Sequence, residues 1–207
     1  MRINMRATLL CFVLGLMAIS AKAQSDAEFK HTLSFGAGAP NLPVLFFNIY
    51  ESKKNFTSEG KGPFHIKYEN RINNFLSLGL NINNMSYHVS YTEDVLDTVN
   101  GIVLPNNIDI RSNNTAFNVR GNIHFINPEK NDKIDVYLGL GLGLRFGKLK
   151  VSSQYESFTP SIKLPNLSRI GFESTIGMRY FLADNIGVYA EFGPAKSLIQ
   201  GGLSLRF

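Results

Sequence analysis

The sequence predicts an all-β fold, an eight-stranded antiparallel up-and-down transmembrane β-barrel preceded by a cleaved signal peptide. Three observations predict it. A basic N-terminus leads into a short apolar run, several later segments alternate between apolar and polar residues, and the final segment, SLIQGGLSLRF, alternates as far as Phe207. A period of two places successive side chains on opposite faces of a sheet. A closed barrel lets such strands cross a membrane because it leaves no unpaired edge.

Residues 1–23 have the pattern of a secretory signal peptide. The basic start contains Arg2 and Arg6, the apolar run covers residues 7–19, and the small residues that signal peptidase reads are Ala21 and Ala23. The apolar run is too short to span a bilayer as a helix. We therefore expect cleavage after Ala23 and a barrel domain over residues 24–207.

Composition and charge exclude several classes of function. The net charge of +5 falls to +2 once the three basic residues of the signal are removed, so no nucleic-acid partner is expected. The one cysteine, Cys11, leaves with the signal, which excludes disulfides and thiol chemistry in the mature chain. His31, His65 and His124 fall on separate predicted strands without the spacing of metal ligands, and neither a metal nor a cofactor is expected.

The first four predicted strands lie between residues 29 and 126. They cover residues 29–39, 62–70, a segment that begins near residue 75, and residues 112–126. Their apolar faces carry Leu33, Phe35 and Ala37, then Phe64, Ile66 and Tyr68, then Leu76, Leu78, Leu80 and Ile82, then Phe117, Val119, Ile123 and Phe125. Polar or small residues fill the positions between, so each segment has one apolar and one polar face.

The fifth predicted strand, KIDVYLGLGLGLRFG over residues 133–147, has the clearest alternation in the chain. Its apolar positions run without interruption from Ile134 to Phe146 and exclude a helix. The remaining strands are predicted at residues 168–182, 186–193 and 197–207. Their apolar faces carry Ile170, Phe172, Ile176, Met178 and Tyr180, then Val188, Ala190 and Phe192, then Ile199, Leu203, Leu205 and Phe207.

Short and long connections alternate along the chain. The short ones, rich in turn-forming residues, are residues 70–74, 127–132 and 183–185, and the long ones are residues 40–61, 92–111 and 152–167. Outer-membrane barrels have short periplasmic turns and longer outer loops. The order therefore predicts an outer-membrane protein with both termini in the periplasm.

Three details refine the outer end of the predicted barrel. The apolar phase of the third strand slips at Asn83–Asn84, for which a β-bulge is the simplest account. Asn100–Gly101 is a hairpin signal, so the third and fourth strands are expected to project beyond the membrane as a ribbon. The apolar segment Leu42 to Tyr50 lacks clean alternation and is interpreted as a short helix or an interfacial anchor.

The direction of the apolar faces decides between a membrane barrel and a soluble lipocalin-like barrel. Uniform rows of Leu, Ile, Val and Phe suit lipid, and rows of Gly with scattered charges suit a narrow interior, so the apolar faces are predicted to point outward. The inward set is then Lys67, Glu69, Arg120, Asp135, Arg145, Glu173, Arg179, Glu191 and Arg206. Buried charges must pair or stay hydrated. We expect an interior ion network of Arg120, Arg145, Glu173, Arg179 and Glu191. Its expected centre is Arg145, Glu173, Arg179 and Glu191. This network either fills the barrel or lines a gated path for small ions.

With its signal, eight strands and terminal GGLSLRF, the chain resembles the small outer-membrane β-barrel family of Gram-negative bacteria. It is similar to the Bacteroidetes-type outer membrane β-barrel domain and, in architecture, to the OmpA and OmpX barrels. The resemblance covers residues 24–207 and implies insertion by the barrel-assembly machinery, which reads the last strand. Leu203, Leu205 and Phe207 are the expected assembly signal.

Function is predicted less closely than fold. The first hypothesis is a non-enzymatic, monomeric barrel that acts in envelope structure or surface interaction through long outer loops, in contact with outer-membrane lipids and lipopolysaccharide. The alternatives are a narrow pore or solute-binding barrel, a lipid A-modifying enzyme and a soluble periplasmic binder. The enzyme hypothesis rests on His88 and Ser90, which share the spacing of the His and Ser in lipid A deacylases, with Glu93 nearby. The residues that surround that pair in the deacylase family are absent here.

Overall fold

The computed structural model describes residues 30–97, 101–126, 132–155 and 170–207. The predicted signal peptide, with Ala21 and Ala23, lies outside these ranges and stays a prediction. Within them, the strands are β1 (His31–Asn41), β2 (Lys54–Arg71), β3 (Leu76–Asp97), β4 (Ile102–His124), β5 (Ile134–Ser153), β6 (Ile170–Phe181), β7 (Ile186–Phe192) and β8 (Ser197–Arg206). Between β1 and β2 lie the helix α2 (Leu42–Phe47) and a 3₁₀ turn (Asn48–Tyr50). None of the helices in the described part of the chain combines the length and the hydrophobicity of a membrane span.

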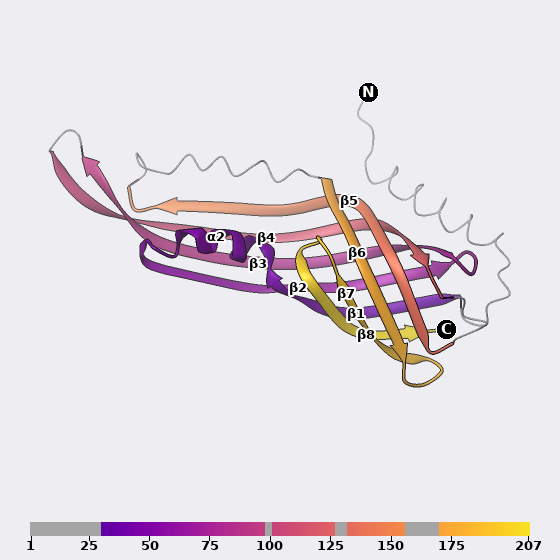
Figure 1. The fold of residues 1–207 in the computed structure, drawn as a ribbon. Coiled ribbons are helices and arrows are strands. Elements are labelled where there is room, and N and C mark those ends of the chain that lie inside the picture. The colour runs from indigo at the N-terminus through magenta and orange to yellow at the C-terminus, as the bar shows by residue number, and fades with distance from the viewer. Residues whose placement is uncertain (1–29, 98–100, 127–131, 156–169) are drawn as a thin grey trace, which may run out of the picture.

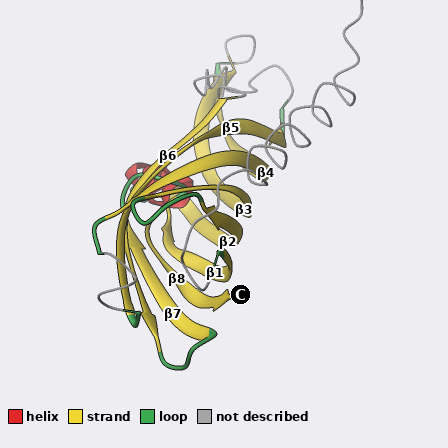
Figure 2. Ribbon diagram, turned by 90° about the vertical axis from the view of Figure 1, so that its right-hand side faces the viewer, coloured by secondary structure: helices red, strands yellow, loops and turns green. Residues whose placement is uncertain are grey.

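The eight strands close into one antiparallel barrel in sequence order (Figure 1; Figure 2). β8 pairs with β1, where Leu203 lies opposite Phe35. Beyond this pairing, the backbones of Phe207 and His31 exchange two hydrogen bonds of 2.9 Å. The up-and-down barrel predicted from the alternation is confirmed, and the last strand closes it.

The apolar rows of the barrel point outward. On β6, Phe172 is 62% exposed and its neighbour Glu173 is 2% exposed, and the same alternation follows β5, where Leu142 is exposed and Tyr137 is buried. A row of exposed Leu, Ile and Phe side chains is stable only against lipid, since water would penalise it. The predicted orientation of the faces is confirmed, and the lipocalin-like alternative is wrong.

The strands β2 to β5 continue well past the ends of β6 to β8 (Figure 1). We call this part of the sheet, residues 54–61, 85–97, 102–115 and 147–153, the extension. Much of what the sequence suggested to be long loops is therefore strand. The predicted ribbon of the third and fourth strands is confirmed by their pairing as far as Asp97 opposite Ile102, but it has four strands rather than two.

The apolar face of β3 changes sides at Asn83–Asn84 without a break in the strand. β3 and β4 pair residue for residue along their whole length with no shift of register. Ile82 is exposed on the outer face, whereas Met85 and Tyr87 are buried on the inner face. The β-bulge predicted at this position is wrong.

The reason for the phase change is a change of environment. Below Asn84 the outer face meets lipid and the inner face is polar, whereas beyond it the outer face carries Ser86, His88 and Ser90. A sheet that has left the bilayer needs a polar outer face, and its inner face then becomes the place for apolar side chains. The register shift of this region lies instead in β2, between Lys61 and Phe64.

The extension has an apolar core of its own. Phe47 of α2 packs against a buried cluster on the inner face, whose other members are Tyr87, Val89, Tyr91, Ile108 and Ile110. Figure 1 shows α2 lying across the extended part of β2 to β4. Of the two interpretations of Leu42 to Tyr50, the short helix is the observed one, and it covers the sheet of the extension.

Candidate functional site: the barrel interior and the extension

The interior of the barrel holds two neighbouring clusters of paired charges. The first, which we call the Glu191 cluster, contains Lys67, Arg120, Glu173 and Glu191. The second, the Arg179 cluster, contains Glu69, Arg71, His124, Asp135 and Arg179. Each of these side chains occupies an inward position because it alternates with a lipid-facing residue on its strand.

Glu191 is the most completely satisfied carboxylate of the interior. Lys67 Nζ lies 2.8 Å from its Oε2, and Arg120 reaches both carboxylate oxygens at 3.0 and 3.1 Å. The hydroxyls of Tyr137 and Thr175 donate two further hydrogen bonds at 2.8 and 3.0 Å. Hydrogen bonds to every open position are what allow a buried ion pair to be tolerated.

Glu173 shares Arg120 with Glu191 and also accepts hydrogen bonds from two side-chain amides. Arg120 Nη1 lies 3.4 Å from Glu173 Oε1, and the side-chain amides of Asn81 and Asn118 donate to Oε2 at 2.7 and 3.1 Å. The Glu191 cluster thus balances two cations with two carboxylates.

Arg179 bridges the two carboxylates of the second cluster. Its guanidinium donates to Glu69 and, at 3.0 Å, to Asp135. His124 lies between the same carboxylates, with Nδ1 at 2.6 Å from Asp135 and Nε2 at 3.1 Å from Glu69. Arg71, which lies near the end of the barrel that carries the C-terminus, contacts Asp135 at 3.2 Å.

Tyr137 separates the two clusters. The Arg179 guanidinium lies over its ring at 4.2 Å and that of Arg120 at 5.8 Å, and its side chain is fully buried. Cation–π contacts of this kind favour a desolvated guanidinium. The ring and the two clusters together fill the middle of the barrel.

The glycines of β5 make room for these side chains. A methyl group on Gly139 would overlap the guanidinium of Arg120, and one on Gly141 would overlap the side chain of Glu173. The run GLGLGL therefore has a physical reason on each face. Leucine faces lipid, and glycine leaves space inside a barrel of eight strands.

Four of the five residues expected in the ion network lie in these clusters, and one does not. Arg120 contacts both Glu173 and Glu191, and Arg179 belongs to the adjacent cluster. Arg145 forms no ion pair with any described residue. It lies nearer the extension, where the described part of the chain offers it no carboxylate partner.

The sequence interpretation placed Lys67, Glu69 and Asp135 inside but missed that they carry the pairing. It also placed His124 and Tyr137 on the polar faces of their strands without including either in the ion network. Both fall at the inward positions of their strands, and that parity was the available signal. Which inward residues contact one another depends on the stagger between distant strands. The alternation of faces along a single strand carries no information about that stagger.

His88 and Ser90 lie on the outer face of the extension and are not linked to each other. His88 Nε2 contacts Asp109 at 2.6 Å, whereas the Ser90 hydroxyl pairs with that of Thr57 at 2.7 Å. A nucleophilic serine needs its base within hydrogen-bond reach. Among the described residues there is also no group of three or more His, Cys, Asp or Glu side chains placed to hold a metal ion.

A closed ring of eight strands, lipid-facing outside and ion-paired inside, defines a small transmembrane β-barrel of the bacterial outer membrane. Residues 9–202 match the family model described as outer membrane protein beta-barrel domain. The chain belongs to this family, and it is an outer-membrane protein of the Gram-negative envelope.

Solved structures with a similar arrangement are barrels of low sequence identity. Ail, the attachment invasion locus protein of Yersinia pestis, is 13% identical with a TM-score of 0.37, and the N-terminal β-barrel domain of Pseudomonas aeruginosa OprF is 11% identical with a TM-score of 0.37. Ail in complex with the heparin analogue sucrose octasulfate gives 13% and 0.33. Each comparison covers 87% of this chain and 100% of the other. A search of curated proteins finds no match. The family assignment rests on the family model.

Proposed function

We propose that this protein is a non-enzymatic, monomeric outer-membrane barrel that holds the extension at the cell surface as an interaction surface. The observation that carries the proposal is the apolar core of the extension. Val89 and Ile110 are fully buried there, above the lipid-facing belt, so the extension is folded rather than a set of mobile loops. Burial of this core fixes the polar outer face in one shape, as a binding surface requires.

The proposed orientation has both termini in the periplasm and the extension outside. The turns are short at the end of the barrel where β1 begins and β8 ends. There β2 joins β3 over residues 72–75, and β6 joins β7 over residues 182–185. Insertion by the barrel-assembly machinery through Leu203, Leu205 and Phe207 agrees with this orientation.

The partner we propose for the lower part of the outer face is lipopolysaccharide. In the pairing register this face carries the rows Lys61–Ser86–Asn113–Lys148, Glu59–His88–Arg111–Lys150 and Thr57–Ser90–Asp109–Ser152. Lys148 follows the lipid-facing Phe146 by two residues, which is about 7 Å along the strand. Arg111, Lys148 and Lys150 therefore form a basic patch at the height where phosphates of the outer leaflet are expected.

Replacing Lys148 and Lys150 together by glutamate is expected to weaken lipopolysaccharide binding by at least about tenfold, since each basic side chain near an anionic surface contributes about 1 kcal/mol. The measurement is fluorescence anisotropy of labelled lipopolysaccharide titrated with the refolded protein in micelles. Lys53→Glu with Lys54→Glu is the matched control, because Lys54 begins β2 at its distal end, Lys53 directly precedes it, and the two pair with Glu93 and Asp94. Equal losses in the two double variants would contradict the proposal.

A narrow pore is the second candidate, and the charged interior is the observation that favours it. Because the two clusters and Tyr137 cross the interior, we expect the wild-type protein to give no stepwise conductance in planar bilayers. The variant with Arg120→Ala and Glu191→Ala removes the centre of the Glu191 cluster and should conduct if those side chains block the path. Conductance steps in the wild type, unchanged in the variant, would favour the pore.

A further inference from the structure

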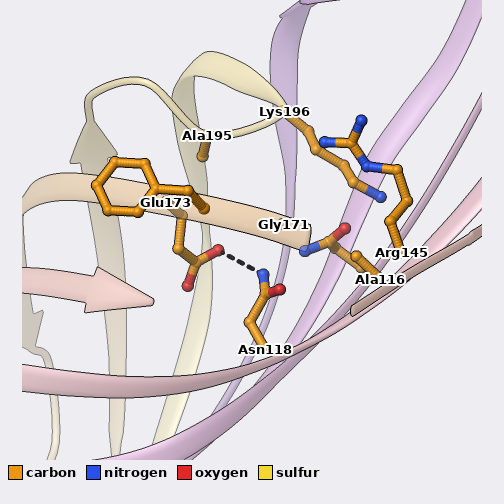
Figure 3. A pocket seen from close by; sticks show the side chains of 9 residues that line it. Ala116, Asn118, Arg145, Gly171, Glu173, Ala195 and Lys196 are labelled. Carbon is orange, nitrogen blue, oxygen red and sulfur yellow. Dashed lines mark hydrogen bonds between the residues drawn. The ribbon is translucent and has the colours of Figure 1, made fainter. Parts of the chain in front are cut away.

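A small pocket lies at the end of the barrel interior that faces the extension. Lys196, from the connection between β7 and β8, and Arg145 of β5 both line it, together with Asn83, Asn118 and Glu173 (Figure 3). The pocket has room for about one water-sized occupant. It is partly open, so an occupant can exchange with the surroundings.

The two cations of this pocket have no partner of opposite charge among the described residues. Lys196 is 7% exposed, and its Nζ has no hydrogen-bond partner. The buried Nε of Arg145 has none either, although Arg145 as a whole is only partly buried. Figure 3 shows the two side chains extending into the same side of the pocket.

Glu173, the carboxylate that lines this pocket, is already engaged. One of its oxygens contacts Arg120 and the other accepts the amides of Asn81 and Asn118. The Glu191 cluster is balanced without Arg145 or Lys196. The pocket therefore carries two positive charges that the described part of the interior does not neutralise.

An unpaired buried charge is unfavourable unless a counter-ion or water compensates it. Burial, and then the charge of Arg145, lower the pKa of Lys196 to about 8, so this lysine is still charged at pH 7. A water molecule that bridges Lys196 to the unpartnered Oδ1 of Asn83 or of Asn118 is the competing occupant. Water, however, leaves both positive charges in place, whereas an anion compensates them.

We propose that this pocket binds one chloride-sized anion between Lys196 and Arg145. The monatomic size follows from the volume of the pocket, and the sign follows from the two unpaired cations. The site is independent of the surface proposed to bind lipopolysaccharide, because Arg145 and Lys196 line the interior pocket whereas Lys148 and Lys150 face outward.

The test is the ³⁵Cl NMR line width of sodium chloride at pH 7 in the presence of the refolded barrel in micelles. We expect the wild type to give excess broadening that saturates with chloride, and we expect Lys196→Gln and Arg145→Gln each to lose it. Lys148→Gln removes the same charge from the outer face of β5 and should keep the broadening. The gel shift on heating checks that each variant is folded.

Two results would overturn the proposal. One is a wild type without broadening above that of empty micelles, which would leave water as the occupant. The other is equal broadening in the wild type, Lys196→Gln and Arg145→Gln, which would assign the effect to exposed cations. A complementary readout is the unfolding midpoint at equal ionic strength, which should be higher in chloride than in gluconate for the wild type and not for Lys196→Gln.

Discussion

Replacing Arg179 by alanine is expected to destabilise the barrel by about 3–5 kcal/mol, because it leaves two carboxylates buried side by side without their shared cation. Glu69 and Asp135 both accept hydrogen bonds from this guanidinium, and both are buried. His124 and Arg71 remain in the variant, but both already contact these carboxylates in the wild type, so they add no new compensation. The measurement is the free energy of unfolding by urea of the barrel refolded in micelles.

The control for this variant is Arg111→Ala, on the outer face of the extension. Arg111 pairs with Asp109 at 2.8 Å, but its side chain is 64% exposed, so its loss should cost less than about 1 kcal/mol. A second variant, with Arg179→Met, Glu69→Gln and Asp135→Asn, removes all three charges and should recover part of the lost stability. Equal effects of Arg179→Ala and Arg111→Ala would show that the interior pairing contributes little.

Deleting Phe207 is expected to remove most of the protein from the outer membrane, whereas deleting residues 155–160 should have a small effect. Phe207 holds the last two hydrogen bonds between β8 and β1, and its ring contacts that of His31 at 5.6 Å between centroids. Without them the pairing of β1 with β8 begins one residue later in β1, at Thr32 opposite Arg206. The proposed assembly signal of Leu203, Leu205 and Phe207 also loses its last member. Unpaired strand edges are unfavourable in lipid.

The measurement is the amount of heat-modifiable protein in washed outer membranes, compared with total expression. The variant Phe207→Leu keeps the length of the strand and an apolar end, and it separates the need for pairing from the need for an aromatic ring. Equal outer-membrane levels of the Phe207 deletion and the 155–160 deletion would contradict the proposed role of the terminus.

The strands inside the bilayer were predictable because lipid acts on each residue separately. A side chain such as Leu142 or Phe172 must be apolar whatever lies across the barrel, so its position can be read from period two alone. The same argument predicted that Arg120, Glu173 and Glu191 lie inside. The pairing of β8 with β1 followed because a strand in lipid cannot leave its backbone edge unpaired.

The extension was only partly predictable because the same pattern has two causes. The phase change after Ile82 is produced either by an extra residue in the strand or by a change of solvent on its outer face. Only the unbroken pairing of β3 with β4 decides for the second cause. α2 is a similar case, because its apolar residues suit lipid as well as the core formed by Val89 and Ile110.

By itself, the sequence determined the number of strands, the face that meets lipid and the charges that must be buried, since these depend on local alternation and solvent. The tertiary structure decided which charges pair. Glu191 pairs with Lys67 and Arg120, whereas Arg145 forms no ion pair with any described residue and lines a small pocket together with Lys196. Those contacts join residues on strands far apart in sequence, and the stagger and closure of the barrel set which of them share a level.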